Sequence, residues 1–178
     1  MSQKLSVVFI ISLALLGSAE ARLPRPRDPS EKSQAASIIV IAEVLGLERT
    51  DPPIWAAKSF ARLRVVRIIK GKGVESTLNF ITVGFSDELN PRCCVVGKKY
   101  LLFLYRGYQV FEEQGGMDVV ALKDPKKYVS AADGAYSAYQ LCGDKVIGWP
   151  LFGRADVGMK EVESQLAITA LTSRHPAQ

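Results

Sequence analysis

The chain has 178 residues, of which 48% are hydrophobic and 23% charged, and it carries a formal net charge of +5. This length suits one domain with a core that needs no disulfide to survive. The positive charge is modest and spread along the sequence, which argues against a nucleic-acid-binding protein. The sequence has one histidine and three cysteines, too few ligands for a zinc site once two thiols pair.

Residues 1–21 have the three parts of a secretory signal peptide. Met1–Lys4 is basic, Leu5–Gly17 is apolar, and Ala19–Ala21 places small residues at the two positions that a signal peptidase reads. The apolar run is shorter than the roughly 20 residues that span a bilayer. We therefore expect a mature protein that begins at Arg22, is secreted or periplasmic, and has no membrane span.

The mature chain is predicted to begin with a proline-rich leader over residues 22–36, extended and exposed. Residues 37–49 are rich in β-branched side chains and predict a strand. Gly46 indicates a bulge within that strand, and the prolines at 52 and 53 are expected to end it.

Residues 58–70 alternate with a period of two and predict a second strand. Its first face carries the odd positions from 61 to 69 and is apolar except for Arg67; its second face is mixed. Gly71–Gly73 predicts a turn, and residues 76–83 predict a third strand that completes a hairpin with the second.

Residues 99–106 are apolar on both faces, which predicts a strand buried on both sides. Further short strands are expected in the later part of the chain, with an irregular segment over 123–130 between them. The apolar residues of the tail recur at spacings of three and four, which predicts an amphipathic helix over 158–173. Residues 174–178 are expected to be a disordered tail. The further short strands are expected at residues 108–111, 117–122 and 136–142.

Five or more strands followed by one helix predict a mainly β fold, a small barrel or sandwich with a helix packed on it. Cys93, Cys94 and Cys142 are expected to form one disulfide in an oxidising compartment. Neighbouring residues on an extended strand point to opposite faces, so Cys93 and Cys94 should not bond each other. Either of them could pair with Cys142, leaving the third thiol buried, modified or in an intermolecular link.

Five short motifs occur along the chain in the order Ala42–Val44, Leu63–Gly71, Gly97–Phe103, Cys142 and Pro150–Leu151. Together, their order and spacing resemble the netrin-like domain found in tissue inhibitors of metalloproteinases and in secreted bacterial proteins. The resemblance covers residues 37–171. It implies a five-stranded Greek-key OB-type barrel with helical additions, and a disulfide between Cys94 and Cys142, with Cys93 as the alternative to Cys94.

The resemblance does not extend to the best-known activity of its inhibitor members. Those inhibitors chelate the zinc of a protease through an amino-terminal cysteine. The expected mature chain begins at Arg22 and has no cysteine before Cys93, so no functional residue is transferred. We expect neither a metal nor a cofactor.

The sequence predicts a protein that is not an enzyme. His175 is the only histidine and lies beyond the predicted helix, where it cannot be held as a catalytic base. The carboxylates fall mostly in predicted loops and do not indicate a catalytic pair. Aromatic residues beside basic groups could bind a ligand, although core packing is their usual role. They are Tyr105, Tyr108, Phe111, Tyr136, Tyr139 and Trp149.

Three residues remain as candidates for binding. Trp55 lies in a Pro-Pro-Ile-Trp loop, where it would cap the barrel or contact a partner, and Arg62 and Arg64 share the mixed face of the second strand. The leading hypothesis is an exported, non-catalytic binding module for a protein partner. The alternatives are a protease inhibitor acting through residues 84–92 or 50–57, and a barrel that binds a polyanion or glycan. We expect a monomer, with a disulfide-linked dimer as the alternative.

Overall fold

The computed structural model describes residues 27–54, 57–83, 91–107, 124–150 and 156–172. They form a mainly β fold in which one sheet of eight strands carries two α-helices and two short 3-10 helices. The strands are β1 (Ile38–Ile54), β2 (Ala57–Lys70), β3 (Thr77–Val83), β4 (Lys99–Arg106), β5 (Tyr128–Ala131), β6 (Ala138–Cys142), β7 (Lys145–Val146) and β8 (Val157–Gly158). The helices are α2 (Pro29–Ala35), α3 (Met159–Thr172), η1 (Pro125–Lys127) and η2 (Gly134–Ser137).

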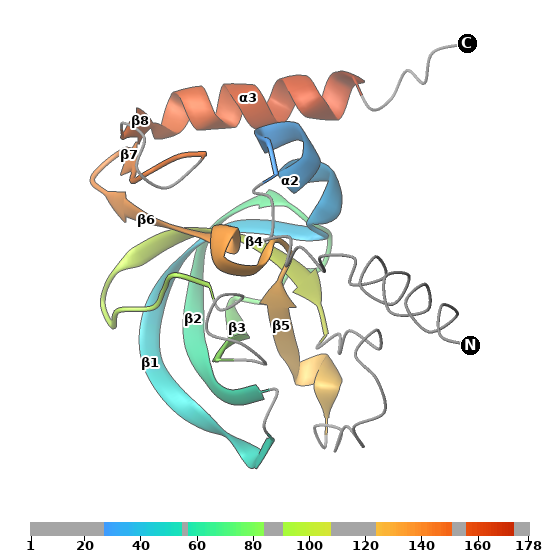
Figure 1. The fold of residues 1–178 in the computed structure, drawn as a ribbon, viewed down its shortest axis with the longest axis vertical. Coiled ribbons are helices and arrows are strands. Elements are labelled where there is room, and N and C mark those ends of the chain that lie inside the picture. Colours follow the sequence, from blue (N-terminus) through green and yellow to red (C-terminus); the bar gives the residue numbers. More distant parts are fainter. Residues whose placement is uncertain (1–26, 55–56, 84–90, 108–123, 151–155, 173–178) are drawn as a thin grey trace, which may run out of the picture.

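Five of the strands close on themselves. The sheet order is β1-β2-β3-β5-β4-β6-β7-β8, and β1 also pairs antiparallel with β4. The resulting five-strand ring is therefore β1-β2-β3-β5-β4, in which only the short β3–β5 pairing is parallel. Figure 1 shows β1 and β2 as long curved strands that extend away from the two helices.

Bulges give β1 and β2 their curvature. The register passes from Val44 directly to Gly46, which confirms the predicted bulge. The expected end of this strand was wrong, because β1 continues to Ile54. Residues 50–53 have no partner in the β1–β2 register, so the two prolines interrupt no ladder hydrogen bond there.

The β1–β2 register also corrects the predicted faces of β2. It passes from Val65 to Arg67 and leaves Val66 as an extra residue. Alternation is therefore broken at Val66, and Arg67 turns toward α3, where it forms an ion pair with Glu163. A one-residue shift moves each following side chain to the other face, which a strict period of two could not anticipate.

Two apolar clusters lie on either side of β1 and β4. The first fills the ring and includes Val40, Leu63 and Phe80, whereas the second lies under the helices and includes Ile39 and Phe103. Consecutive residues of β1 thus enter different clusters, as strand geometry requires. The prediction that residues 99–106 are buried on both sides is confirmed, because positions 100–104 of β4 are all buried.

The two helices lie side by side at one end of the ring (Figure 1). The expected extended leader was wrong over residues 29–35, which form α2. Asp28 caps this helix in a reciprocal capping box with Glu31, and Pro29 occupies the first turn, where it is favoured. At the other end of α2, Lys70 donates hydrogen bonds to the carbonyls of Ser33 and Ala36, which satisfies groups that a helix end leaves unpaired.

Two further expectations concern the second half of the chain. The segment predicted to be irregular contains β5, a strand of only four residues that pairs with β3 and β4. So short a strand leaves little alternation for the sequence to reveal. Helix α3 covers Met159–Thr172, where the spacing of apolar residues predicts one. The strands expected at 108–111 and 117–122 lie outside the described residues.

Candidate binding surfaces

The disulfide differs from the one expected. Cys93 is bonded to Cys94, and Cys142 is a free, exposed cysteine at the end of β6. The expected Cys94–Cys142 bridge, with Cys93 as its alternative, is therefore wrong. The argument against a Cys93–Cys94 bond assumed an extended strand, but the two residues lie in the turn before β4. Their peptide bond is cis, and their Cα atoms are 3.1 Å apart.

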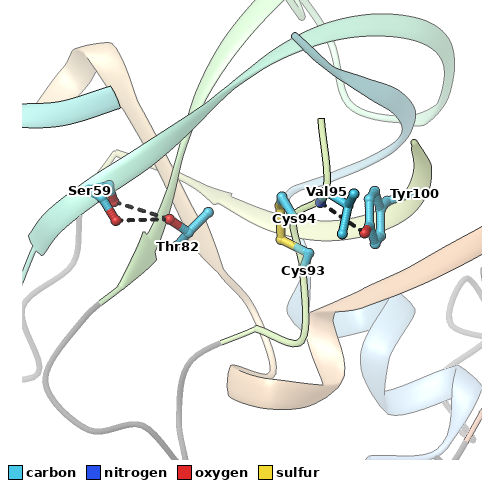
Figure 2. The surroundings of a disulfide bond; sticks show 6 residues. All are labelled: Ser59, Thr82, Cys93, Cys94, Val95 and Tyr100. Atoms are coloured by element: carbon cyan, nitrogen blue, oxygen red, sulfur yellow. Dashed lines mark hydrogen bonds between the residues drawn. A yellow bond between two sulfur atoms is a disulfide. The ribbon is translucent and has the colours of Figure 1, made fainter. Parts of the chain in front are cut away.

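The turn that carries the disulfide is fixed to the ring. Both half-cystines pack against the cluster inside the ring. The backbone N–H of Val95 donates to the Tyr100 hydroxyl at 3.1 Å, as Figure 2 shows, and Lys98 N–H donates to the Val95 carbonyl at 3.1 Å. The same picture includes Ser59 and Thr82, whose hydroxyls bond across the β2–β3 hairpin at 3.2 Å.

The turn also pairs with β1, and both segments carry exposed aliphatic residues. Gly97 N–H donates to the Val44 carbonyl at 2.8 Å, and Val44 N–H donates to the Lys98 carbonyl at 3.0 Å. These bonds hold the turn beside the bulged part of β1. We call the exposed aliphatic residues of these two segments the apolar tip; they are Leu45 (41% exposed), Leu47 (55%), Val95 (56%) and Val96 (56%).

The two arginines proposed for binding are exposed on β2, but they differ in their contacts. Arg64 Nη2 lies 2.7 Å from Glu43 Oε2 and forms a hydrogen-bonded ion pair. Arg62 Nη1 lies 3.9 Å from Glu48 Oε1, a separation too long for a hydrogen bond. Each arginine thus faces a glutamate of β1, so the two do not make a purely cationic face. Trp55 lies outside the described residues.

An open groove of about 770 Å³ crosses β2, β3 and β5. Arg62 lines this groove, whereas Arg64 does not. Sequence reasoning missed the other central residues: Phe60 looked like an ordinary strand residue, and Tyr128 was placed in an irregular segment. The lining residues are Ile38, Glu48, Phe60, Arg62, Glu75, Thr77, Leu78, Asn79, Arg106, Gly107, Asp124, Lys126, Lys127, Tyr128 and Val129.

A buried ion pair joins α2 to the turn after β5. The ammonium of Lys32 is fully buried, forms an ion pair with Asp133, and donates to the Tyr136 carbonyl at 3.2 Å. Burial lowers the pKa of Lys32, and Asp133 offsets this effect only in part. Burial also raises the pKa of Tyr139, whose ring lies 5.6 Å from the ammonium. With no exposure to solvent, the Lys32 ammonium can attach a helix but cannot meet a ligand.

Three of the remaining aromatic candidates lie in or against the apolar core. Tyr139 and Trp149 are buried in the cluster under the helices, and Tyr105 packs against it. Their usual role in packing therefore applies to these three residues. Tyr136 is partly buried beside Lys32, and Tyr108 and Phe111 lie outside the described residues.

Within the described ranges, no three cysteine, histidine or carboxylate side chains gather where a metal ion could be held. His175 lies outside those ranges. Among the helices that the structure describes, none has the length and hydropathy needed to cross a bilayer. The absence of a catalytic site, a metal and a cofactor stays a prediction.

No protein-family model matches the chain, and no curated protein matches its sequence.

Proposed function

We propose that this chain is an exported, non-catalytic binding module that contacts a protein partner through the apolar tip. The observation that carries the proposal is the exposure of four large aliphatic side chains on two segments joined by backbone hydrogen bonds. Exposed apolar patches of this kind mark interaction sites. Two hydrogen bonds to Val44 and the packing of the disulfide hold the tip in place, which lowers the entropy lost on binding.

We also propose that the five-strand ring is the OB-type Greek-key barrel implied by the netrin-like resemblance. The order β1-β2-β3-β5-β4, closed by the β1–β4 pairing, supports this assignment. The parallel β3–β5 contact supports it further. The disulfide departs from the pattern of the family, because Cys142 is not bonded to Cys93 or Cys94.

The chemistry around the tip indicates the kind of partner. Lys98 and Lys99 follow the two exposed valines and are themselves exposed. Typical protein interfaces have an apolar centre with a polar rim, and charge complementarity raises their association rate. We therefore propose a partner whose contact surface combines apolar side chains with carboxylates.

A site-specific photo-crosslinker at Val96 tests this proposal in extracts of the organism that makes the protein. The matched control carries the same crosslinker at Lys160, which is exposed on α3. We expect one adduct at position 96 that is absent at position 160. Introducing Val95→Asp should reduce the yield of that adduct about tenfold or more, because a carboxylate then occupies the apolar centre.

Direct binding measurements with the identified partner complete the test. Exchanging both lysines for glutamate (Lys98→Glu, Lys99→Glu) should raise the Kd at least about tenfold, and added salt should slow association. Equal adducts at both positions, or none at position 96, would contradict the proposal. An adduct with lipid rather than protein would do the same. If the partner is a protease and loses activity when bound, the module acts as an inhibitor.

A further inference from the structure

The groove across β2, β3 and β5 carries an inference that is independent of the proposed protein partner. Three of its residues lie in one row on adjacent strands: Arg62 is opposite Asn79, and Asn79 is opposite Tyr128. Residues directly opposite each other project from the same face of a sheet. Glu48 of β1 is opposite Phe60 rather than in this row, and its carboxylate reaches diagonally toward Arg62 at 3.9 Å. A guanidinium, a carboxamide and a phenol thus follow one another across three strands, with a carboxylate from β1 beside the guanidinium.

The charges of the groove nearly balance. Four basic and three acidic side chains line it. Two pairs of opposite charge face each other without hydrogen bonding: Arg62 and Glu48 at 3.9 Å, and Lys127 and Asp124 at 3.6 Å. With opposite charges so nearly balanced, the groove offers a polyanion little net attraction, whereas the loosely paired groups keep their donors and acceptors for a neutral ligand.

Aromatic side chains supply the apolar part of the groove. Phe60 is only 8% exposed, and its ring meets that of Tyr128 edge to face, with centroids 5.3 Å apart. Packing against Phe60 fixes the Tyr128 ring, which is itself only partly buried. A fixed aromatic face can support the C–H groups of a sugar ring, while polar side chains beside it bond the hydroxyls.

We infer that the groove binds a neutral oligosaccharide. Tyr128 supplies the stacking surface, Arg62 and Asn79 donate hydrogen bonds to sugar hydroxyls, and Glu48 accepts them. The volume of about 770 Å³ lies within the range of small-molecule sites.

An array of neutral and sulphated oligosaccharides, probed with the full chain, is the first test, followed by titration of the best neutral glycan. We expect Arg62→Ala and Tyr128→Leu each to raise its Kd about tenfold. The matched control is Arg64→Ala, on the same strand and paired with a glutamate but outside the groove; it should change the Kd less than twofold. Circular dichroism of each variant confirms that it is folded.

Salt dependence separates a neutral ligand from a charged one. Raising NaCl from about 50 to 500 mM should change the Kd of the neutral glycan less than twofold, whereas a phosphate- or sulphate-dependent ligand would lose affinity steeply. No binding to any neutral glycan overturns the inference, and so does preferential, salt-sensitive binding to the sulphated members. Equal effects of Arg62→Ala and Arg64→Ala would also overturn it. None of these outcomes bears on the crosslinks formed at the apolar tip.

Discussion

The helix-covered part of the molecule and the apolar tip treat polar and apolar side chains in opposite ways. Under α2 and α3, a lysine is completely buried, and helices cover the apolar face of the sheet. At the apolar tip, four aliphatic residues are exposed, and the neighbouring lysines are in solvent. The first arrangement fixes elements to one another, and the second leaves apolar area free for a partner. The comparison teaches that burial, rather than residue type, separates structural from binding roles in this chain.

The largest expected effect is at the helix-covered end. Trp149 is 1% exposed, stacks on Phe103 with ring centroids 5.7 Å apart, and donates to Gln165 Oε1 at 2.8 Å. Trp149→Ala should lower the free energy of unfolding by about 3–5 kcal/mol, because it leaves a large cavity. The control Val96→Ala should change it by less than about 0.5 kcal/mol. Denaturant unfolding measures the free energy of unfolding of both variants. Similar losses in the two would show that the helix-covered part and the apolar tip do not differ in their structural roles.

A second effect comes from the buried ion pair. Lys32→Ala leaves the Asp133 carboxylate, which is 8% exposed, without its main cation. We expect a loss of about 3 kcal/mol in the free energy of unfolding. The double variant Lys32→Met, Asp133→Asn removes both charges. Its free energy of unfolding should fall clearly less than that of Lys32→Ala. A double variant as unstable as Lys32→Ala would show that the charges themselves stabilise the fold.

The pH dependence of the free energy of unfolding tests whether the burial of Lys32 outweighs its attraction to Asp133. Burial holds the pKa of Lys32 below the value of 10.5 expected in the unfolded chain, despite Asp133. Below 10.5 the unfolded chain therefore binds more protons, so this group makes the protein more stable as the pH rises toward 10.5. The variant Lys32→Met has no ionisable group at this position. The stability of the wild type should therefore increase relative to that variant between about pH 8 and pH 10.

Denaturant unfolding of both proteins at the two pH values tests this sign. Ionisation of Tyr139 in the unfolded chain affects both proteins and cancels in the difference. A wild type that loses stability relative to Lys32→Met over this range would indicate that Asp133 outweighs the cost of burial.

The smallest expected effect on stability is at the tip. Reduction of the Cys93–Cys94 bond opens a loop of two residues, so the chain-entropy contribution to the free energy of unfolding is only about 1 kcal/mol. Mass spectrometry without reduction should find Cys142 alkylated and both half-cystines within one peptide that is 2 Da lighter. A peptide cross-linked through Cys142 would refute this pairing and restore the expected one.

Much of the fold could be predicted because strong local patterns specify it. β4 has exactly the predicted bounds, and the bulge at Gly46 follows from the cost of glycine in a strand. The extra residue at Val66 could not be predicted, since it depends on how β1 and β2 match across the sheet. Helix α2 has few apolar residues, so its capping box and Pro29 in its first turn are the local signals for it.

The binding surfaces were harder to predict than the fold. Arg62 and Arg64 look equivalent in the sequence, and the geometry of their ion pairs and the position of the groove distinguish them. Tyr128 and Asn79 are 49 positions apart in the chain and meet through the parallel β3–β5 pairing. The disulfide was mispredicted because a rule for strands was applied to a turn. Each of these relations is set by tertiary structure.

The contact between α2 and α3 has a consequence for the order of assembly. One helix precedes the strand ring in the chain and the other follows it, yet together they cover the same face. During synthesis, Ile39 and Phe103 are fully buried only after residues 159–172 have been made and have packed on the sheet. A chain truncated before α3 would therefore expose part of the apolar face of the sheet to chaperones and proteases, so this face is protected only once α3 has been synthesised.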